Sequence, residues 1–216
     1  MCRRMTANAL RLKEYIDAIE DFRFIEPDLC PYRHHIGALL TDTILQAGVN
    51  YRSVVWPRVE SVLLRFPEAE TISIFSQVLQ KYGTRNVLNW NNRDKLRRMD
   101  ELVSFCYYQS IETTEDLTIF LKDEKNIQLL KEINGIGNKT CDYVRRLLGF
   151  DTVAVDRHIR SFLEEADIIY QDYYEIKEVV EFAADFMECT RRELDYSIWK
   201  YMSDKHSHAI QLSFDF

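Results

Sequence analysis

The sequence predicts an all-α protein, and three observations predict it. Apolar residues recur at spacings of three and four residues along the chain, as on one face of a helix. Sustained alternation of apolar and polar residues, which indicates strands, does not occur. With 216 residues, 46% of them hydrophobic and 29% charged, the chain has the composition of a globular protein of one large domain or two small ones.

Four helices are expected in the first half of the chain. The third follows Pro57, because proline is tolerated in the first turn of a helix but not in its interior. The fourth ends at Gly83, since glycine is a common C-terminal stop. The apolar positions that define the four are Leu10, Ile16 and Ile19; Ile36, Leu39, Leu40 and Ile44; Val62 to Phe66; and Ile72 to Tyr82.

Seven further helices are expected in the second half. Their expected ranges are Leu96 to Tyr107, Asp116 to Leu121, Ile127 to Ile133, Cys141 to Leu148, Ile159 to Ala166, Tyr174 to Met187 and Leu194 to Met202. The fourth of these is followed by Gly149, again a natural stop.

Charge and hydropathy limit the function classes. No stretch approaches the roughly 20 apolar residues of a membrane span, and the N-terminus has no apolar signal core, so a protein of the cytoplasm or nucleoid, as a monomer, is expected. The formal charge of −7 argues against indiscriminate binding to phosphate polymers. Residues 85–98 nevertheless carry five basic residues and one acidic residue, a local net charge of 5 − 1 = +4. This run is either a local nucleic-acid site or the solvated face of a helix.

The segment NGIG, residues 134–137, separates two expected helices. Two glycines in four residues permit positive φ and close backbone approach, so a tight helical hairpin is predicted. The free amides of the second helix would favour an anion such as phosphate. A P-loop is excluded because Asn138 separates Gly137 from Lys139, and a dinucleotide fingerprint is excluded because Thr140 stands where its third glycine belongs. A purely structural turn remains an alternative.

A second segment, VAVDRHI, places Asp156 at the expected start of a helix. Aspartate is among the best N-caps, so this residue has a structural alternative to any chemical role. Lys139 could likewise be a solvated amine, and His158 a buried, hydrogen-bonded histidine.

Together, INGIGNKTCDYV and VAVDRHI resemble the signature of the endonuclease III superfamily of DNA glycosylases, a helix-hairpin-helix and a Gly/Pro-rich loop followed by an aspartate. Asn134 departs from the family pattern by replacing the usual proline. The positions that match are Ile133, Gly135, Ile136, Gly137, Lys139 and Thr140 in the first segment and Val155, Asp156 and His158 in the second.

The resemblance implies an activity and its residues. Lys139 would attack the deoxyribose C1′, expel the base and form a Schiff base, and Asp156 would stabilise positive charge on the sugar and help move protons. A monovalent cation at the hairpin is the one cofactor that it suggests, and the implied partner is duplex DNA with a damaged or modified base. The implied DNA contacts are Gly135, Gly137, Asn138, Thr140 and His158.

The resemblance also implies an architecture of two helical subdomains with a cleft between them. Residues 34–150 would form a helical barrel that carries the hairpin, and residues 1–33 with 151–216 would form the second domain. In TDTILQAGVN, Gln46 is at the position of a glutamine that fills the gap left by an extruded base. A glutamine that only caps a helix is the alternative.

Two departures bear on the substrate. Cys189 is the only cysteine after Asp156, so the four-cysteine iron-sulfur cluster of endonuclease III is not expected. The segment ELDYSIWKYMSDK resembles cluster-free 8-oxoguanine glycosylases and would place Trp199 near the base pocket, although a core tryptophan would fit equally well. An oxidised purine is therefore the expected substrate class. An oxidised pyrimidine or another modified base, a non-catalytic DNA-binding module and a purely structural helical protein remain alternatives.

Overall fold

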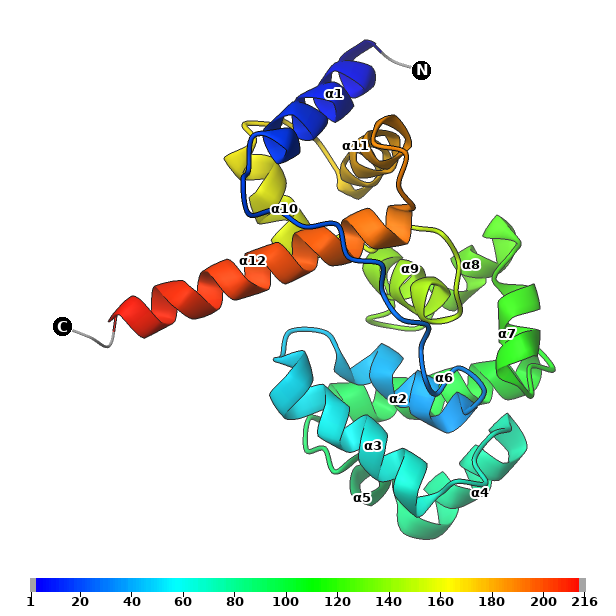
Figure 1. Ribbon diagram of the computed structural model, residues 1–216. Coiled ribbons are helices and arrows are strands. Elements are labelled where there is room, and N and C mark those ends of the chain that lie inside the picture. The colour runs from blue at the N-terminus through cyan, green and yellow to red at the C-terminus, as the bar shows by residue number, and fades with distance from the viewer. Residues whose placement is uncertain (1–2, 214–216) are drawn as a thin grey trace. The chain divides into compact units, whose positions relative to one another are not determined.

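A computed structural model describes residues 3–213, with side chains described over residues 3–205 (Figure 1). The described chain contains helices and loops and no strand, which confirms the predicted all-α class. The helices are α1 (Arg3–Asp17), α2 (Ile36–Leu45), the π-helical turn η1 (Tyr51–Val55), α3 (Trp56–Arg65), α4 (Ile72–Tyr82), α5 (Thr84–Leu88), α6 (Arg93–Tyr108), α7 (Thr114–Phe120), α8 (Glu124–Leu130), α9 (Asn138–Leu147), α10 (Arg157–Glu165), α11 (Tyr173–Phe186) and α12 (Arg191–Ser213).

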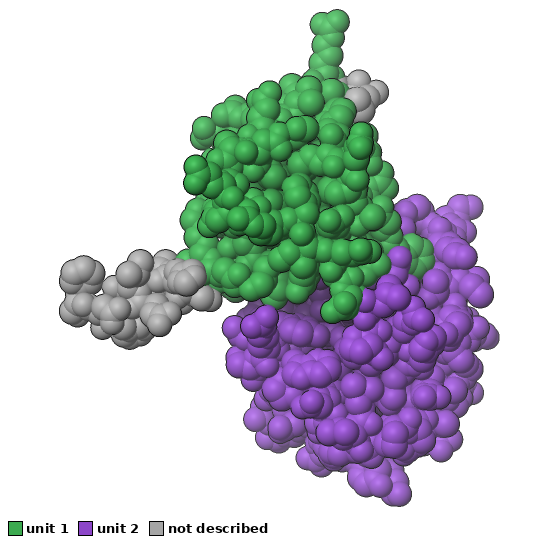
Figure 2. All heavy atoms as spheres, viewed as in Figure 1, with its two compact units in different colours: residues 1–28, 150–216 green, residues 29–149 purple. Residues whose placement is uncertain are grey.

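The chain divides into two compact units (Figure 2). The central unit comprises residues 29–149, and the terminal unit comprises residues 1–28 and 150–216. The resemblance led us to expect residues 34–150 for the first and residues 1–33 with 151–216 for the second. The observed division thus transfers residues 29–33 to the central unit and residue 150 to the terminal unit.

Helix α2 is the core of the central unit. All ten of its residues are buried, and it packs against α3, α4, α6 and α9. A helix that is apolar nearly all round is expected at such a position. Its close packing requires Gly37, because a Cβ there would lie 2.8 Å from a ring carbon of Phe75.

A histidine fixes the start of α2. The Nδ1 atom of His35 accepts a hydrogen bond from the backbone N–H of Ala38 at 3.0 Å, which caps the helix. Its Nε2 therefore carries the proton and donates to the carbonyl of Phe66 at 2.9 Å. The buried ring thus connects the entry of α2 to the end of α3.

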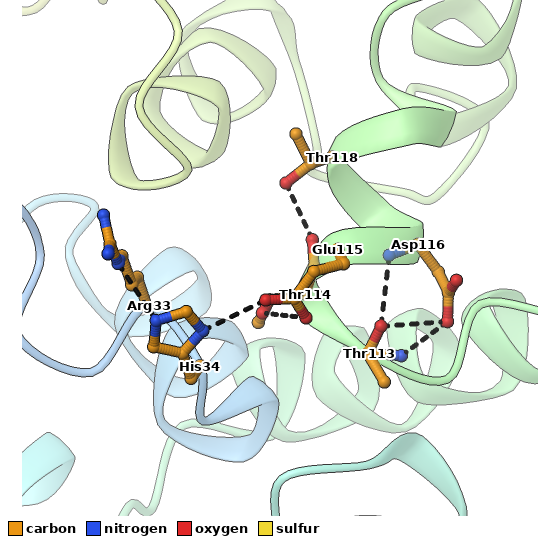
Figure 3. Close-up of polar contacts among 7 residues, drawn as sticks. All are labelled: Arg33, His34, Thr113, Thr114, Glu115, Asp116 and Thr118. Atoms are coloured by element: carbon orange, nitrogen blue, oxygen red, sulfur yellow. Dashed lines mark hydrogen bonds and ion pairs between the residues drawn. The ribbon is translucent and has the colours of Figure 1, made fainter.

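The chain before α2 is attached to α7 by polar contacts (Figure 3). His34 Nδ1 lies 3.0 Å from a carboxyl oxygen of Glu115, and Arg33 Nε donates to His34 Nε2 at 3.1 Å. The first turn of α7 is closed by a capping box between Thr113 and Asp116. Residues 33–34 and the start of α7 therefore support each other at the surface.

Over residues 3–28 and 150–213, the terminal unit contains four helices. Helix α1 packs against α11, and α10 and α11 pack against α12. Phe162 of α10 is fully buried, with the ring of Tyr15 edge-on at 5.3 Å. The extended segment before α10 is fixed where the backbone N–H of Ala154 donates to buried Asp195 at 2.7 Å. This contact sets the position from which α10 begins.

Most expected helices are confirmed, with differences at helix ends and at short elements. Helix α4 ends at Gly83 as predicted, with φ at +81°. Helix α1 ends at Asp17, before Ile19, and α12 continues past Met202 to Ser213. The turn η1 and the five-residue helix α5 were not expected, because neither is long enough to show an apolar period.

Candidate functional site

The turn between α8 and α9 is the predicted hairpin. Gly135 has φ at +88°, a conformation that favours glycine, and a Cβ at this position would overlap the guanidinium of Arg98. Gly137 is different, because its φ is −110° and a Cβ would meet nothing within 4 Å. The turn itself therefore needs the first glycine, and the second serves as the N-cap of α9 without a side-chain cap.

Two basic side chains fix this hairpin. Arg98 of α6 donates from Nε to the carbonyl of Asn134 at 3.0 Å. Lys131, at the end of α8, donates from Nζ to Oδ1 of Asn138 at 2.7 Å and so connects the two ends of the turn. The carbonyl of Asn134 is thereby held in place.

Lys139 is the second residue of α9, and its amine contacts α2. The half-buried Nζ donates to Oε1 of Gln46 at 2.7 Å, across 93 residues of sequence. Gln46 is the C-cap of α2 and is only 9% exposed. Its Nε2 atom is buried, and no hydrogen-bond acceptor is found for it among the described residues. The Gln46 amide thus accepts from Lys139 through Oε1, while its Nε2 donor has no partner among the described residues.

A second contact joins α2 and α9 one turn away. Tyr143 donates to Oδ1 of Asp42 at 3.0 Å. Tyr143 follows Lys139 by four residues on α9, whereas its partner Asp42 precedes Gln46 by four residues on α2. Since four residues are about one helical turn, the two helices run antiparallel with these contacts on facing sides.

Asp42 is fully buried and accepts from three tyrosines. Besides Tyr143, the hydroxyls of Tyr32 and Tyr51 donate to Oδ2, the latter at 3.1 Å. Burial raises the pKa of the Asp42 carboxyl, and the hydrogen bonds from the tyrosines act in the opposite direction. Burial and the Asp42 carboxyl together raise the pKa of Tyr143 well above its ordinary value. All three hydroxyls therefore stay protonated and donate.

Lys95 of α6 holds the end of α2 from another side. Its Nζ donates to the carbonyls of Leu45 and Ala47, each at 2.7 Å, and lies 4.9 Å from the ring centre of Trp90. Burial, and then the charges of Arg98 and Lys139, lower the pKa of Lys95 to about 8. The C-terminal end of α2 is therefore surrounded by amines from α6 and α9.

In the terminal unit, Asp156 is the N-cap of α10. Its Oδ1 accepts from the backbone N–H groups of His158 at 2.8 Å and Ile159 at 3.1 Å. His158 is buried, and its ring lies edge-on to half-buried Trp199, with the centroids 6.5 Å apart. Trp199 is stacked on Tyr196 at 5.6 Å. The cap that the sequence allowed is thus present.

The structure brings some of the expected site residues together. Lys139 and Gln46 of the central unit are in contact, and Asp156 belongs to the terminal unit. Gly137 is exposed and Asn138 is half-buried at the start of α9.

Two of the expected DNA contacts have buried side chains. Gln46 lies at the C-cap of α2, the position of the capping alternative, and is buried in contact with Lys139, so that its role as a wedge stays a prediction. Thr140 has its side chain in the core, where it lines an apolar cavity with Ile136 and Val144, because it faces inward from the first turn of α9. The backbone amide of Thr140 is the part that remains suited to an anion.

Sequence reasoning missed three residues of this region, namely Asp42, Trp90 and Lys95. Asp42 did leave a signal, since it is the only charged residue in the uninterrupted segment 36–47. Lys95 was counted in the basic run 85–98, but the run does not reveal which side chain faces inward.

The described residues contain neither a cluster of metal ligands nor a helix that could span a membrane. Among them, no three His, Cys, Asp or Glu side chains gather as metal ligands would. Cys30, Cys106, Cys141 and Cys189 are free thiols. None of the described helices combines the length and apolarity that crossing a membrane requires.

Comparisons with known proteins give one match. Neither a curated protein nor a solved structure shows detectable similarity to the chain. The family described as "Domain of unknown function (DUF8548)" matches residues 23–203, which is most of the 216 residues. The chain therefore belongs to the DUF8548 family.

Proposed function

We propose that the protein is a bifunctional DNA glycosylase and abasic-site lyase that excises a damaged or modified base from duplex DNA. The observation that carries this proposal is the contact between Lys139 and Gln46. The resemblance assigns both residues to the lesion site, and they come from segments 93 residues apart in the sequence. The packing of α9 on α2 brings them together, as it also brings Tyr143 to Asp42.

In the proposed reaction, the neutral amine of Lys139 attacks C1′ of the deoxyribose. The bond from C1′ to the base breaks as the bond from C1′ to Nζ forms, and the base leaves with one proton of the amine. The bond from C1′ to O4′ then breaks, O4′ takes the second proton, and the Schiff base forms between C1′ and Nζ. Loss of a proton from C2′ then eliminates the 3′ phosphate and cleaves the strand. The reaction needs no redox cofactor, but it does need Lys139 to lose its ammonium proton.

Asp156 would supply a carboxylate to this reaction. Both of its cap hydrogen bonds are made by Oδ1, so capping α10 does not use Oδ2. One oxygen can therefore hold the helix while the other stabilises positive charge on the sugar or moves a proton. The structural and the catalytic interpretations of Asp156 are compatible.

An oxidised purine such as 8-oxoguanine is the substrate class that we propose. The stacked pair of Tyr196 and Trp199 supports it, because a half-buried aromatic face is a suitable surface for a planar base. The binding partner would be duplex DNA of the cytoplasm or nucleoid.

Borohydride trapping tests the proposal. The wild-type chain is incubated with duplexes that carry 8-oxoguanine, an oxidised pyrimidine, uracil, an alkylated base or an abasic site, and reduction should join protein to DNA on at least one of them. Lys139→Gln should abolish the covalent product, whereas Lys125→Gln, which removes an exposed lysine of α8, should not. A wild-type chain that is never trapped would refute the proposal.

The same assay separates the rival function, a non-catalytic DNA-binding module. The cap role of Asp156 is the observation that favours this rival, because it explains the residue without chemistry. Salt-sensitive retention of DNA without trapping or nicking would support it.

A further inference from the structure

Lys95 is a half-buried ammonium without a carboxylate partner. Its recorded contacts are the carbonyls of Leu45 and Ala47 and the ring of Trp90, and no ion pair with it is found in the described part of the chain. Partial burial of a charge next to other cations is unfavourable, and the two carbonyls and the Trp90 ring offset part of that cost.

The two carbonyls that Lys95 binds flank Gln46 in the sequence. Leu45 is the last residue of α2 and Ala47 follows its C-cap, so both carbonyls lie at the helix end where unpaired carbonyls and the negative end of the helix dipole favour a cation. Because both neighbours of Gln46 are fixed, its side chain has a defined direction toward Lys139. Lys95 therefore controls where the acceptor for the Lys139 amine lies.

We propose that Lys95 is a positioning residue for Lys139, which fixes the end of α2 that contacts the amine and whose positive charge favours loss of the amine's proton. The proposal rests on the proposed function in that it takes Lys139 as the nucleophile. It goes beyond that function because it names the residue that prepares the nucleophile.

The electrostatic part of the argument follows from reciprocity. After burial, the charges of Arg98 and Lys139 are what lower the pKa of Lys95 to about 8. Repulsion between two cations acts equally on both, so a charged Lys95 favours the neutral form of Lys139. At a pKa of about 8, Lys95 itself remains mostly charged at pH 7.

Other groups around the two lysines act in both directions. Gln46 opposes the effect of Lys95 on Lys139, because an oxygen that accepts a hydrogen bond from the Lys139 amine favours its charged form. Lys81 of α4 is exposed and contacts the ring of Tyr82, and Arg85 of α5 is exposed and donates to Asn91. Other charged groups on the surrounding helices include Arg98 on α6, Arg58 of α3 at the Trp90 ring, and the Asp42 carboxyl on α2.

An NMR titration of the DNA-free protein tests the relation between the two lysines. Lysines are labelled by reductive ¹³C-methylation, and the Lys139 signal is assigned by its loss in Lys139→Gln. In Lys95→Met the titration midpoint of Lys139 should rise by about one pH unit, a tenfold smaller neutral fraction at a given pH. Lys95→Arg should keep the wild-type midpoint, because it keeps the charge.

Arg97→Met is the matched control, since it removes an exposed cation from the same helix. If Lys95→Met does not fold, Lys95→Gln, which retains an amide donor, replaces it and should show the same rise. An equal Lys139 midpoint in the wild type and in the uncharged variant would overturn the proposal.

Trapping on an abasic-site duplex supplies the second readout. Lys95→Met should be trapped about tenfold more slowly than wild type at pH 7 and should approach it at higher pH. A midpoint shift in a protein that is never trapped would refute the proposed function but uphold the pairing of the lysines. Normal trapping without a midpoint shift would refute only the role of Lys95.

Discussion

The hydroxyl of Tyr143 lies 3.0 Å from the buried carboxyl of Asp42, so that the hairpin helix α9 is joined to the central helix α2 one turn beyond Lys139. This contact and the one between Lys139 and Gln46 fix the rotation of α9 about its axis. The position of the amine thus depends on a polar cluster that is itself remote from the hairpin turn.

Tyr143→Phe should destabilise the central unit by about 1.5–3 kcal/mol, because it removes a buried hydrogen bond to a carboxyl and leaves the ring in place. Urea unfolding followed by circular dichroism measures the loss. Tyr51→Phe is the comparison. Tyr51 donates to the same carboxyl but is only half-buried, so the loss of its hydroxyl should reduce stability less. Equal and negligible losses would contradict the cluster's structural role.

Gly135→Ala should destabilise the hairpin by about 1–3 kcal/mol, because its positive φ strains any side chain and a Cβ would displace Arg98. Gly137→Ala should cost less than about 1 kcal/mol, since its backbone is in an ordinary region and the space around it is open. Chemical unfolding of both variants checks this order. The reverse order would show that the turn is wrongly described.

Asp156→Asn should leave stability within about 0.5 kcal/mol of wild type, because asparagine caps a helix about as well as aspartate. Asp156→Ala should cost about 1 kcal/mol through loss of the cap. If Asp156 also takes part in chemistry, both variants should lose base release to a similar extent while DNA binding persists. If base release falls only in the variant that loses stability, Asp156 acts only as the N-cap of α10.

The stability of the α7 region should depend on pH through Asp116. Hydrogen bonds from the backbone N–H groups of Thr113 and Glu112 lower the pKa of its carboxyl. A carboxyl with a lowered folded pKa stabilises the fold above the ordinary carboxyl range, and this contribution is lost as pH falls through the folded value. Melting temperatures measured from pH 7 down to about pH 3 should therefore fall more steeply for wild type than for Asp116→Asn.

Asp94→Asn is the control for this pH experiment, because it removes the same charge from the first turn of α6 where the carboxyl has only a weak ion pair at 3.9 Å. Its acid profile should resemble that of the wild type. A profile for Asp116→Asn as steep as that of the wild type would show that the capping box does not control acid stability.

Much of the helical layout could be predicted from the sequence, because its signals are local. The end of α4 at Gly83, the glycine turn at residues 134–137 and the start of α10 at Asp156 each depend on residues within one or two turns. The five-residue α5 escaped prediction since it is too short to show a period, and it ends at Asn89 with φ at +47°, which is uncommon outside glycine.

The candidate site was predicted less completely. The residues of the hairpin could be named from their order along the chain, but the burial of the Gln46 and Thr140 side chains could not. Lys95 belongs to the basic run 85–98, and the sequence does not distinguish which of its basic residues binds an anion. Which side of α6 faces inward is set by the helices that pack on it.

By itself, the sequence determined the all-α class, most helix ends and the hairpin, because periodicity, caps and glycine conformations act over a few residues. Only the tertiary structure decided that Lys139 meets Gln46, that three tyrosines converge on Asp42, and that Lys95 holds the end of α2. Such contacts arise when α2 is buried among its neighbours and a buried carboxyl such as that of Asp42 needs hydrogen-bond donors from other segments. Partners up to 101 residues away in the chain cannot be recognised before that burial is known.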